Sequence, residues 1–306
     1  MPYWSDDRAF PMTVHHEFLF RLYVHTNLNK SPGIRSPVVM VKKRYPFLIS
    51  IPHGGTEVPE IVRPLLLLDE DELSYYCDPQ TRVLFGFEER VAAYIDTPVS
   101  RMIVDLNRPP LPLPLRDPDG IIKVRTIDGK EVYRPGNVPD MQLIHTLLRT
   151  HYFPFHQRID ELIDRHPVRI AFDCHSMLPL GSRFQKDAGR SRPLICLGNN
   201  GDRQGRAKKG SIATCSSEWI TTLADVFMEE FAVGREIAIN NPFSGGFISN
   251  AHYWHKGIPW IQIEINRVLY EPSESSAGSD NEIPDRSIWL REKIWNVLTS
   301  FWKQVR

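Results

Sequence analysis

The chain contains 306 residues, 42% of them hydrophobic and 24% charged, and this apolar content excludes an intrinsically disordered protein. Lysine plus arginine and aspartate plus glutamate both total 37, so the formal net charge is zero. This balance removes any overall electrostatic basis for binding nucleic acid or an anionic membrane surface.

The first hundred residues are predicted to begin irregularly and then to alternate strand and helix. Residues 1–45 are interrupted by prolines and contain one expected strand, at 38–42. Near-continuous apolar runs, typical of strands buried on both faces, follow at 47–51 and 98–106. Between them, apolar residues at three- and four-residue spacing predict a helix over 69–95.

A long connection follows over residues 108–140. It is too rich in proline and glycine for a helix, and loops of this length in a compact domain are usually lids or binding elements. Asp128 and Gly129 favour a turn that closes a hairpin from 121–126 to 131–133.

The second half repeats the alternation of strands and helices. Pro154 is expected to break or kink the first of its helices. The predicted helices are 141–165, 218–231 and 285–305, and the predicted strands are 168–174, 193–197, 236–240 and 260–265. This order predicts an α/β fold, a mainly parallel or mixed sheet covered on both faces, formed by a single domain over residues 1–306.

A basic loop is expected at 183–210, which holds eight lysines and arginines against two acidic residues. Such density could meet a phosphate group, but a solvated loop is the commoner outcome.

The cysteines and the N-terminus bear on the compartment. Cys77, Cys174, Cys196 and Cys215 show no zinc-ribbon spacing, and we interpret them as free buried thiols of a cytoplasmic protein. No apolar run approaches the roughly 20 residues that span a bilayer. The first residues also lack the basic-then-apolar order of a secretory signal.

The segment SIPHGGTE carries the first candidate site residues. His53 follows a predicted strand at the edge where open α/β sheets place ligands, and Glu57 lies four residues later. A histidine and a carboxylate are typical zinc ligands, each about 2.0–2.2 Å from the metal. A helix N-terminus with a capping histidine is the alternative.

The segment FDCHSM carries the second group of candidate site residues. Strand alternation places Asp173 and His175 on one face, where the carboxylate can accept the second ring proton of a ligand histidine. A buried, hydrogen-bonded histidine is the alternative. Cys174 points to the opposite face, which argues against a cysteine–histidine nucleophile.

Two further strand ends carry polar groups. Gln262, Glu264 and Asn266 share one face of a buried strand, so Glu264 must be paired, for example with Arg267, or must act as a general base. Asn107 and Arg108 end another strand and suit a substrate carboxylate, because a guanidinium binds carboxylates bidentately. Arg101 and Arg267 are further candidates for this role.

Four segments together resemble the N-formylglutamate amidohydrolase family over residues 45 to 275: SIPHGGTEVP, SRMIVDLNRPP, FDCHSM and NPFSGGFISNAHYWHKGIPWIQIEINRVLY. That family is similar to zinc carboxypeptidases and aspartoacylases. The resemblance therefore implies a three-layer α/β/α sandwich around a mixed sheet.

The resemblance also implies a site. It makes His53 and His175 zinc ligands, with Glu57 the first choice for the third ligand and Asp78 the second. It makes Glu264 the general base that deprotonates the attacking water, and Asn107 with Arg108 the grip on the substrate carboxylate. His156 and His252 are candidate supports of the ligands or substrate contacts, although a structural role is the commoner outcome for each.

The predicted function is zinc-dependent hydrolysis of the amide of an N-acyl amino acid, with N-formyl-L-glutamate as the favoured substrate. One alternative is a related zinc deacylase or carboxypeptidase that acts on another N-acyl amino acid or a small peptide. A second is a non-catalytic protein that binds carboxylates or nucleic acid. We expect a small-molecule substrate and no membrane partner, and the residues do not indicate an oligomeric state.

Overall fold

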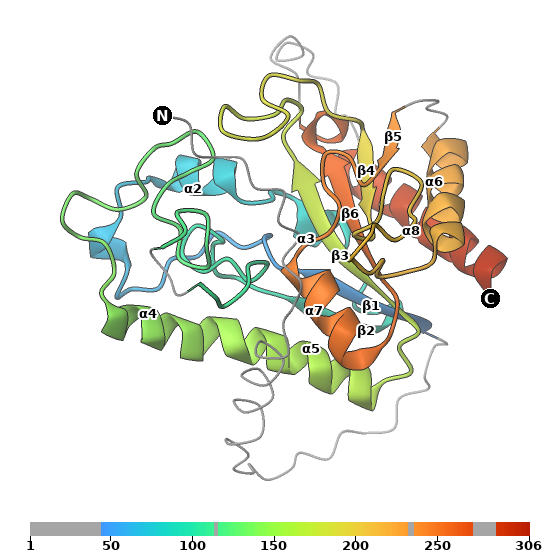
Figure 1. Cartoon of the computed structure of the whole chain (residues 1–306), viewed down its shortest axis with the longest axis horizontal. Helices are drawn as coiled ribbons and strands as arrows, with labels where there is room; N and C mark the ends of the chain where they lie inside the picture. Colours follow the sequence, from blue (N-terminus) through green and yellow to red (C-terminus); the bar gives the residue numbers. More distant parts are fainter. Residues whose placement is uncertain (1–43, 113–115, 232–235, 272–285) are drawn as a thin grey trace.

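The computed structural model of the chain describes residues 44–112, 116–231, 236–271 and 286–306. Six strands form one mixed sheet in the order β2-β1-β3-β6-β4-β5 (Figure 1). Their bounds are β1 Tyr45–Ile51, β2 Val91–Asp96, β3 Ile170–Met177, β4 Ile195–Gly198, β5 Ile237–Ile239 and β6 Trp260–Asn266. The first four strands of that order are parallel, and β4 pairs antiparallel with β6 while β5 runs parallel to β4.

Alternate strand residues face two separate apolar layers. Phe47 and Ile49 belong to the core under α6 (Ser217–Phe231) and α8 (Arg286–Val305). Leu48 and Ala171 belong to the core under α5 (Phe153–Arg165) and α7 (Phe247–Lys256). Because apolar side chains are buried on both faces, the predicted three-layer α/β/α arrangement with a mixed sheet is confirmed.

The predicted helix at 69–95 is wrong beyond its start. Helix α2 (Glu70–Tyr76) begins at Asp69 with a capping box and ends before Pro79, which disfavours helical geometry at the residue that precedes it. A short helix α3 (Thr81–Leu84) follows, and the chain then enters strand β2. The alanines of VAAYID are poor strand formers, so only pairing with β1 reveals this strand.

The predicted strand at 98–106 is also wrong. Residues 100–104 form a tight turn in which the amides of Ile103 and Val104 both donate to the carbonyl of Ser100. These apolar side chains are buried in the core on the α5 side without joining the sheet. An apolar run therefore indicated burial correctly and backbone conformation incorrectly.

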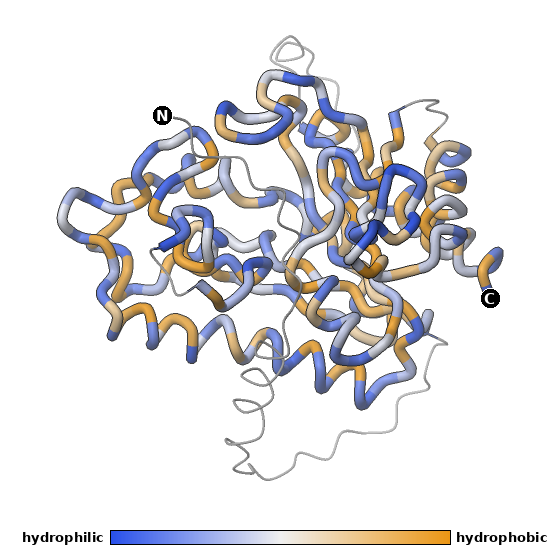
Figure 2. Tube along the Cα trace, in the orientation of Figure 1, coloured by the Kyte–Doolittle hydropathy of each residue, from blue (hydrophilic) through white to orange (hydrophobic). Residues whose placement is uncertain are grey.

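The long helical prediction at 141–165 is confirmed, with an interruption. Helix α4 (Met141–Leu147), a π-helical turn η2 (Leu148–Tyr152) and α5 follow one another. Pro154 lies in the first turn of α5, where proline is tolerated, and the π turn takes the place of the expected kink. In Figure 2 this long element alternates between hydrophobic and hydrophilic segments.

The remaining predictions are settled as follows. The helices at 218–231 and 285–305 correspond to α6 and α8, whereas α7 was not predicted and closes on Gly257 at φ +69. The predicted hairpin at 121–133 reduces to one bridge between Arg125 and Glu131 around Gly129.

Short 3-10 turns lie at η1 Arg63–Leu65 and η3 Arg267–Leu269. The strand at 38–42 lies outside the described residues.

Within the described ranges, no helix is both long enough and apolar enough to cross a membrane.

Candidate metal centre and amidohydrolase site

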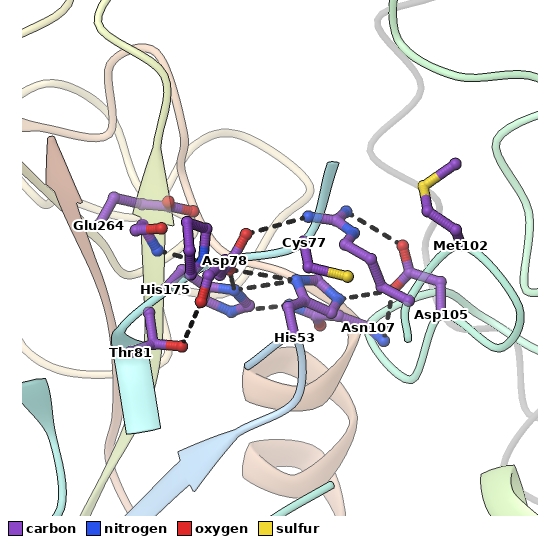
Figure 3. Close-up of polar contacts among 12 residues, drawn as sticks. His53, Cys77, Asp78, Thr81, Met102, Asp105, Asn107, His175 and Glu264 are labelled. Carbon is purple, nitrogen blue, oxygen red and sulfur yellow. Dashed lines mark hydrogen bonds and ion pairs between the residues drawn. The ribbon is translucent and has the colours of Figure 1, made fainter. Parts of the chain in front are cut away.

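Three side chains from separate parts of the chain converge on one point (Figure 3). His53 follows β1, His175 lies in β3, and Asp78 follows α2. Nδ1 of His175 lies 3.1 Å from Nδ1 of His53 and 3.0 Å from Oδ2 of Asp78, and Nδ1 of His53 lies 3.5 Å from the same oxygen. Tetrahedral ligands at about 2.1 Å from a zinc ion are about 3.4 Å apart, so these atoms have the spacing of a zinc site.

Carboxylates hold the outer nitrogen of each histidine. Nε2 of His53 lies 2.7 Å from Oδ1 of Asp105, and Nε2 of His175 lies 3.1 Å from Oδ2 of Asp173. Donation of the Nε2 proton to a carboxylate leaves Nδ1 with a lone pair, which is the tautomer that a metal ligand needs. Two lone pairs and a carboxylate oxygen therefore face one another, and this donor set fits a cation.

The electrostatics of the group favour positive charge. Burial alone would lower the pKa of His175, but the carboxylates of Asp173 and Asp78 raise it well above its ordinary value. Burial would likewise raise the pKa of Asp78, but His175 and His53, when protons instead of a cation occupy their Nδ1 atoms, hold it well below its usual range. The pocket thus stabilises an anionic carboxylate beside a cation.

The structure places Glu57, the first choice for the third ligand, outside this group and brings Asp78, the second choice, into it. Glu57 is exposed, and its backbone pairs with the 98–100 segment: its amide donates to Pro98 and its carbonyl accepts from Ser100. That pairing is possible because a Cβ on Gly55 would lie 2.2 Å from the backbone of Pro98. Only glycine allows such a close approach.

Glu264 reaches the centre through strand pairing. It lies opposite His175 in the parallel register of β3 and β6 and is 7% exposed. Burial raises its pKa to about 8. Nε2 of Gln262 donates to Oε1 of Glu264 over 2.7 Å, which orients the carboxyl group.

The two residues predicted to bind the substrate carboxylate, Asn107 and Arg108, have different surroundings in the structure. The Asn107 amide is buried: its nitrogen lies 3.1 Å from Oδ2 of Asp173 and 3.2 Å from Nε2 of His175, and its oxygen accepts from the amide of Ile248. Arg108 is more open, with its side chain 29% exposed and Nη2 bonded to Oδ2 of Asp119 over 2.7 Å. Asn107 therefore belongs to the hydrogen-bond network around the candidate metal centre, whereas Arg108 binds an internal carboxylate, that of Asp119.

The two further arginines have structural partners. Arg101 lies 3.5 Å from Oδ1 of Asp78 and 3.1 Å from Oδ2 of Asp105. Arg267 is buried and donates to the carbonyls of Tyr75 and Cys77, so it fixes the backbone just before Asp78. Arg267, which lies three residues after Glu264 in the sequence, therefore has backbone carbonyls as its partners and does not need an ion pair with Glu264.

The two long loops meet at one point. The ring of Phe184, in the 183–210 loop, lies against Gly129 in the 108–140 loop, where a Cβ would be 2.5 Å from the ring. Arg192, one of the basic residues, is buried and bonded to Asp187 within the same loop. The basic loop is thus partly neutralised by its own acidic residue.

Residues 45–271 match the model of the N-formylglutamate amidohydrolase family. The chain belongs to this family. The resemblance seen in the four sequence segments is therefore confirmed, and the buried histidine–aspartate–histidine group lies inside the matched region.

Two curated relatives agree with this assignment, and two solved structures share the fold. N-formylglutamate deformylases of Pseudomonas aeruginosa and Pseudomonas putida are 27% and 26% identical over 236 and 237 residues, each match covering 74% of this chain and 82% of the relative. A crystal structure of N-formylglutamate amidohydrolase from Ralstonia eutropha JMP134 aligns with a TM-score of 0.64 at 18% identity, over 87% of this chain and 95% of that one. A gene product of Agrobacterium tumefaciens gives 0.59 at 19% identity, over 86% and 91%. The two structures show the fold.

Asp78→Asn and Glu57→Gln form a matched pair that tests the third ligand of this family member. We expect Asp78→Asn to lose most of its zinc on dialysis, because a neutral amide replaces an anionic ligand, whereas Glu57→Gln keeps the wild-type content. Elemental analysis of the dialysed proteins measures both. Zinc loss in Glu57→Gln with full retention in Asp78→Asn would reverse the assignment.

Proposed function

We propose that this protein is a zinc-dependent amidohydrolase that cleaves N-formyl-L-glutamate to formate and glutamate. The observation that carries the proposal is the convergence of His53, Asp78 and His175 with Glu264 beside them, in a chain of this family. The names of the Pseudomonas relatives support the choice of substrate. Four buried free cysteines suit a reducing compartment, and we place the enzyme in the cytoplasm.

His53, Asp78 and His175 would hold the metal through the three atoms that face one another. When bound, zinc supplies Lewis-acid polarisation of a carbonyl and lowers the pKa of water to about 7.

Glu264 is the proton carrier of the proposed reaction. Its raised pKa, about 8, makes the ionised carboxylate a stronger base, and this form takes a proton from the attacking water. It then delivers that proton to the nitrogen of the departing glutamate. Gln262 holds Oε1 of this carboxyl group, so Oε2 is left for the transfer.

Arg108 is the group proposed to grip a substrate carboxylate. Its guanidinium already binds one carboxylate, that of Asp119, through Nη2, and its Nε donates to the Asp119 carbonyl. Tyr152 fixes the Arg108 backbone through a 2.7 Å hydrogen bond to its carbonyl. A held carboxylate positions the acyl group, which lowers the entropic part of the barrier.

Glu264→Gln tests the proton carrier. We expect formate release to fall by about 10²–10⁴-fold, because the amide cannot accept a proton. Zinc content should stay at the wild-type level, since Glu264 is not among the three convergent ligands. Formate is measured from N-formylglutamate before and after chelation, beside a panel of other N-acyl amino acids and small peptides.

Wild-type turnover in Glu264→Gln would exclude this role. Chelator-insensitive formate release would exclude the metal, and zinc without formate release would move the substrate to another member of the panel.

Arg108→Gln tests the carboxylate clamp. Loss of a charge-assisted hydrogen bond is worth about 1.5–3 kcal/mol, so we expect kcat/KM to fall about 10- to 150-fold. Steady-state kinetics on N-formylglutamate and on its α-amide measure the change. If Arg108 binds the α-carboxylate, the α-amide should lose much less than the acid; an equal loss for both substrates would contradict the assignment.

A further inference from the structure

One short segment holds both candidate metal-binding histidines from behind. In residues 105–108, Asp105 bonds Nε2 of His53, and the Asn107 amide donates to Oδ2 of Asp173, the oxygen that accepts from Nε2 of His175. The distance between the two rings therefore depends on where this segment lies. It is not part of a strand, so its position must be fixed by other contacts.

Two of those contacts come from the junction of η2 and α5. Nε2 of His156 lies 3.0 Å from the carbonyl of Leu106, and the hydroxyl of Tyr152 donates to the carbonyl of Arg108 over 2.7 Å. Tyr152 and His156 are four residues apart and so share one helix face. The carbonyl of Leu106 lies between the two residues that hold the histidines, which makes the bond from His156 the central one.

His156 is itself oriented by a buried chain of polar groups. Nδ1 of His156 lies 3.0 Å from Nε2 of His252, and Nδ1 of His252 lies 2.9 Å from Oδ1 of Asp160. His255 contacts the other oxygen of Asp160 at 3.0 Å. His156 and His252 have no exposed surface, and Asp160 is 4% exposed. Burial of this kind requires that the hydrogen bonds be matched.

The carbonyl of Leu106 sets the direction of the bonds at His156. A carbonyl only accepts, so Nε2 of His156 carries a proton, and its Nδ1 is the acceptor that faces Nε2 of His252. Nδ1 of His252 in turn faces the Asp160 carboxylate. His156 is neutral in this arrangement, in line with burial lowering its pKa to about 3.

We propose that His156 is a positioning residue for the metal centre: held by His252 and Asp160, it fixes the Leu106 carbonyl and thereby the spacing of His53 and His175. The proposal rests on the function proposed above, because it assumes that these histidines bind zinc. It gives a role to a histidine pair that touches neither the metal ligands nor Glu264 in the described contacts.

A matched pair of amide variants tests the proposal. Gln at position 156 places its amide nitrogen where Nε2 lies, and Asn places its own where Nδ1 lies. His156→Gln should keep the bond to Leu106 and bind zinc within about threefold of wild type, while His156→Asn should bind about 10- to 100-fold more weakly, the usual loss when the outer partner of a ligand is removed. Zinc affinity is measured by competition with a chromophoric chelator on metal-free protein.

Three controls make the result decisive. Thermal unfolding of the metal-free variants separates positioning from folding, because a merely structural role would lower both Tm values and leave zinc affinity equal. If His156→Asn does not fold, Asp160→Asn, which weakens the hold on His252, should shift zinc affinity in the same direction. Tyr152→Phe removes the neighbouring bond at Arg108 and should have the smaller effect.

Equal zinc affinity of wild type and His156→Asn, both folded, would overturn the positioning role and leave the proposed function intact. A wild-type protein that binds no zinc would overturn the proposed function itself.

Discussion

A fully buried carboxylate, that of Asp105, is the interaction on which the site depends. Burial alone would raise its pKa, but Lys123, His53 and Arg101 hold it well below its usual range, with Nζ of Lys123 at 2.9 Å and Arg101 at 3.1 Å. A buried charge is tolerated only when it is paired in this way. Its partners come from the β1 end, the 100–104 turn and the long loop, so one anion ties together three segments that carry no regular pairing with each other.

The sheet supplies the second constraint. Because β1, β3 and β6 run parallel, residues at the same level along them face the same edge, and His53, His175 and Glu264 are brought together from positions more than 200 residues apart in the chain. The pairing of His175 with Glu264 leaves no freedom in their relative height. The loops then add Asp78 and Arg108, whose positions depend on hydrogen bonds instead of strand register.

Local sequence pattern was sufficient to place His53, His175 and Glu264 at or near the ends of predicted buried strands, because apolar runs mark such strands. Their grouping into one site rests on the resemblance to the family. The carboxylate that follows α2 could not be ranked as a candidate ligand in the same way. Choosing Asp78 over Glu57 requires the close approach of Gly55 to Pro98, a contact across more than 40 residues.

The wrong predictions of secondary structure have the same origin. Apolar residues at 98–106 are buried through a turn, and the strand at 91–96, which contains two alanines, is recognised only from its pairing with β1. The link between His156 and His252 spans 96 residues and needs both helices in place.

With Arg108 in its proposed role, the Arg108–Asp119 pair makes substrate binding a competition between two carboxylates. For the proposed substrate, the carboxylate must displace an internal anion already bonded to the guanidinium at 2.7 Å. The apparent affinity is then reduced by the fraction of time that Asp119 occupies the cation. A ligand without a carboxylate cannot replace Asp119 as the partner of the guanidinium. Under this proposal, Asp119 therefore favours the binding of ligands that carry a carboxylate.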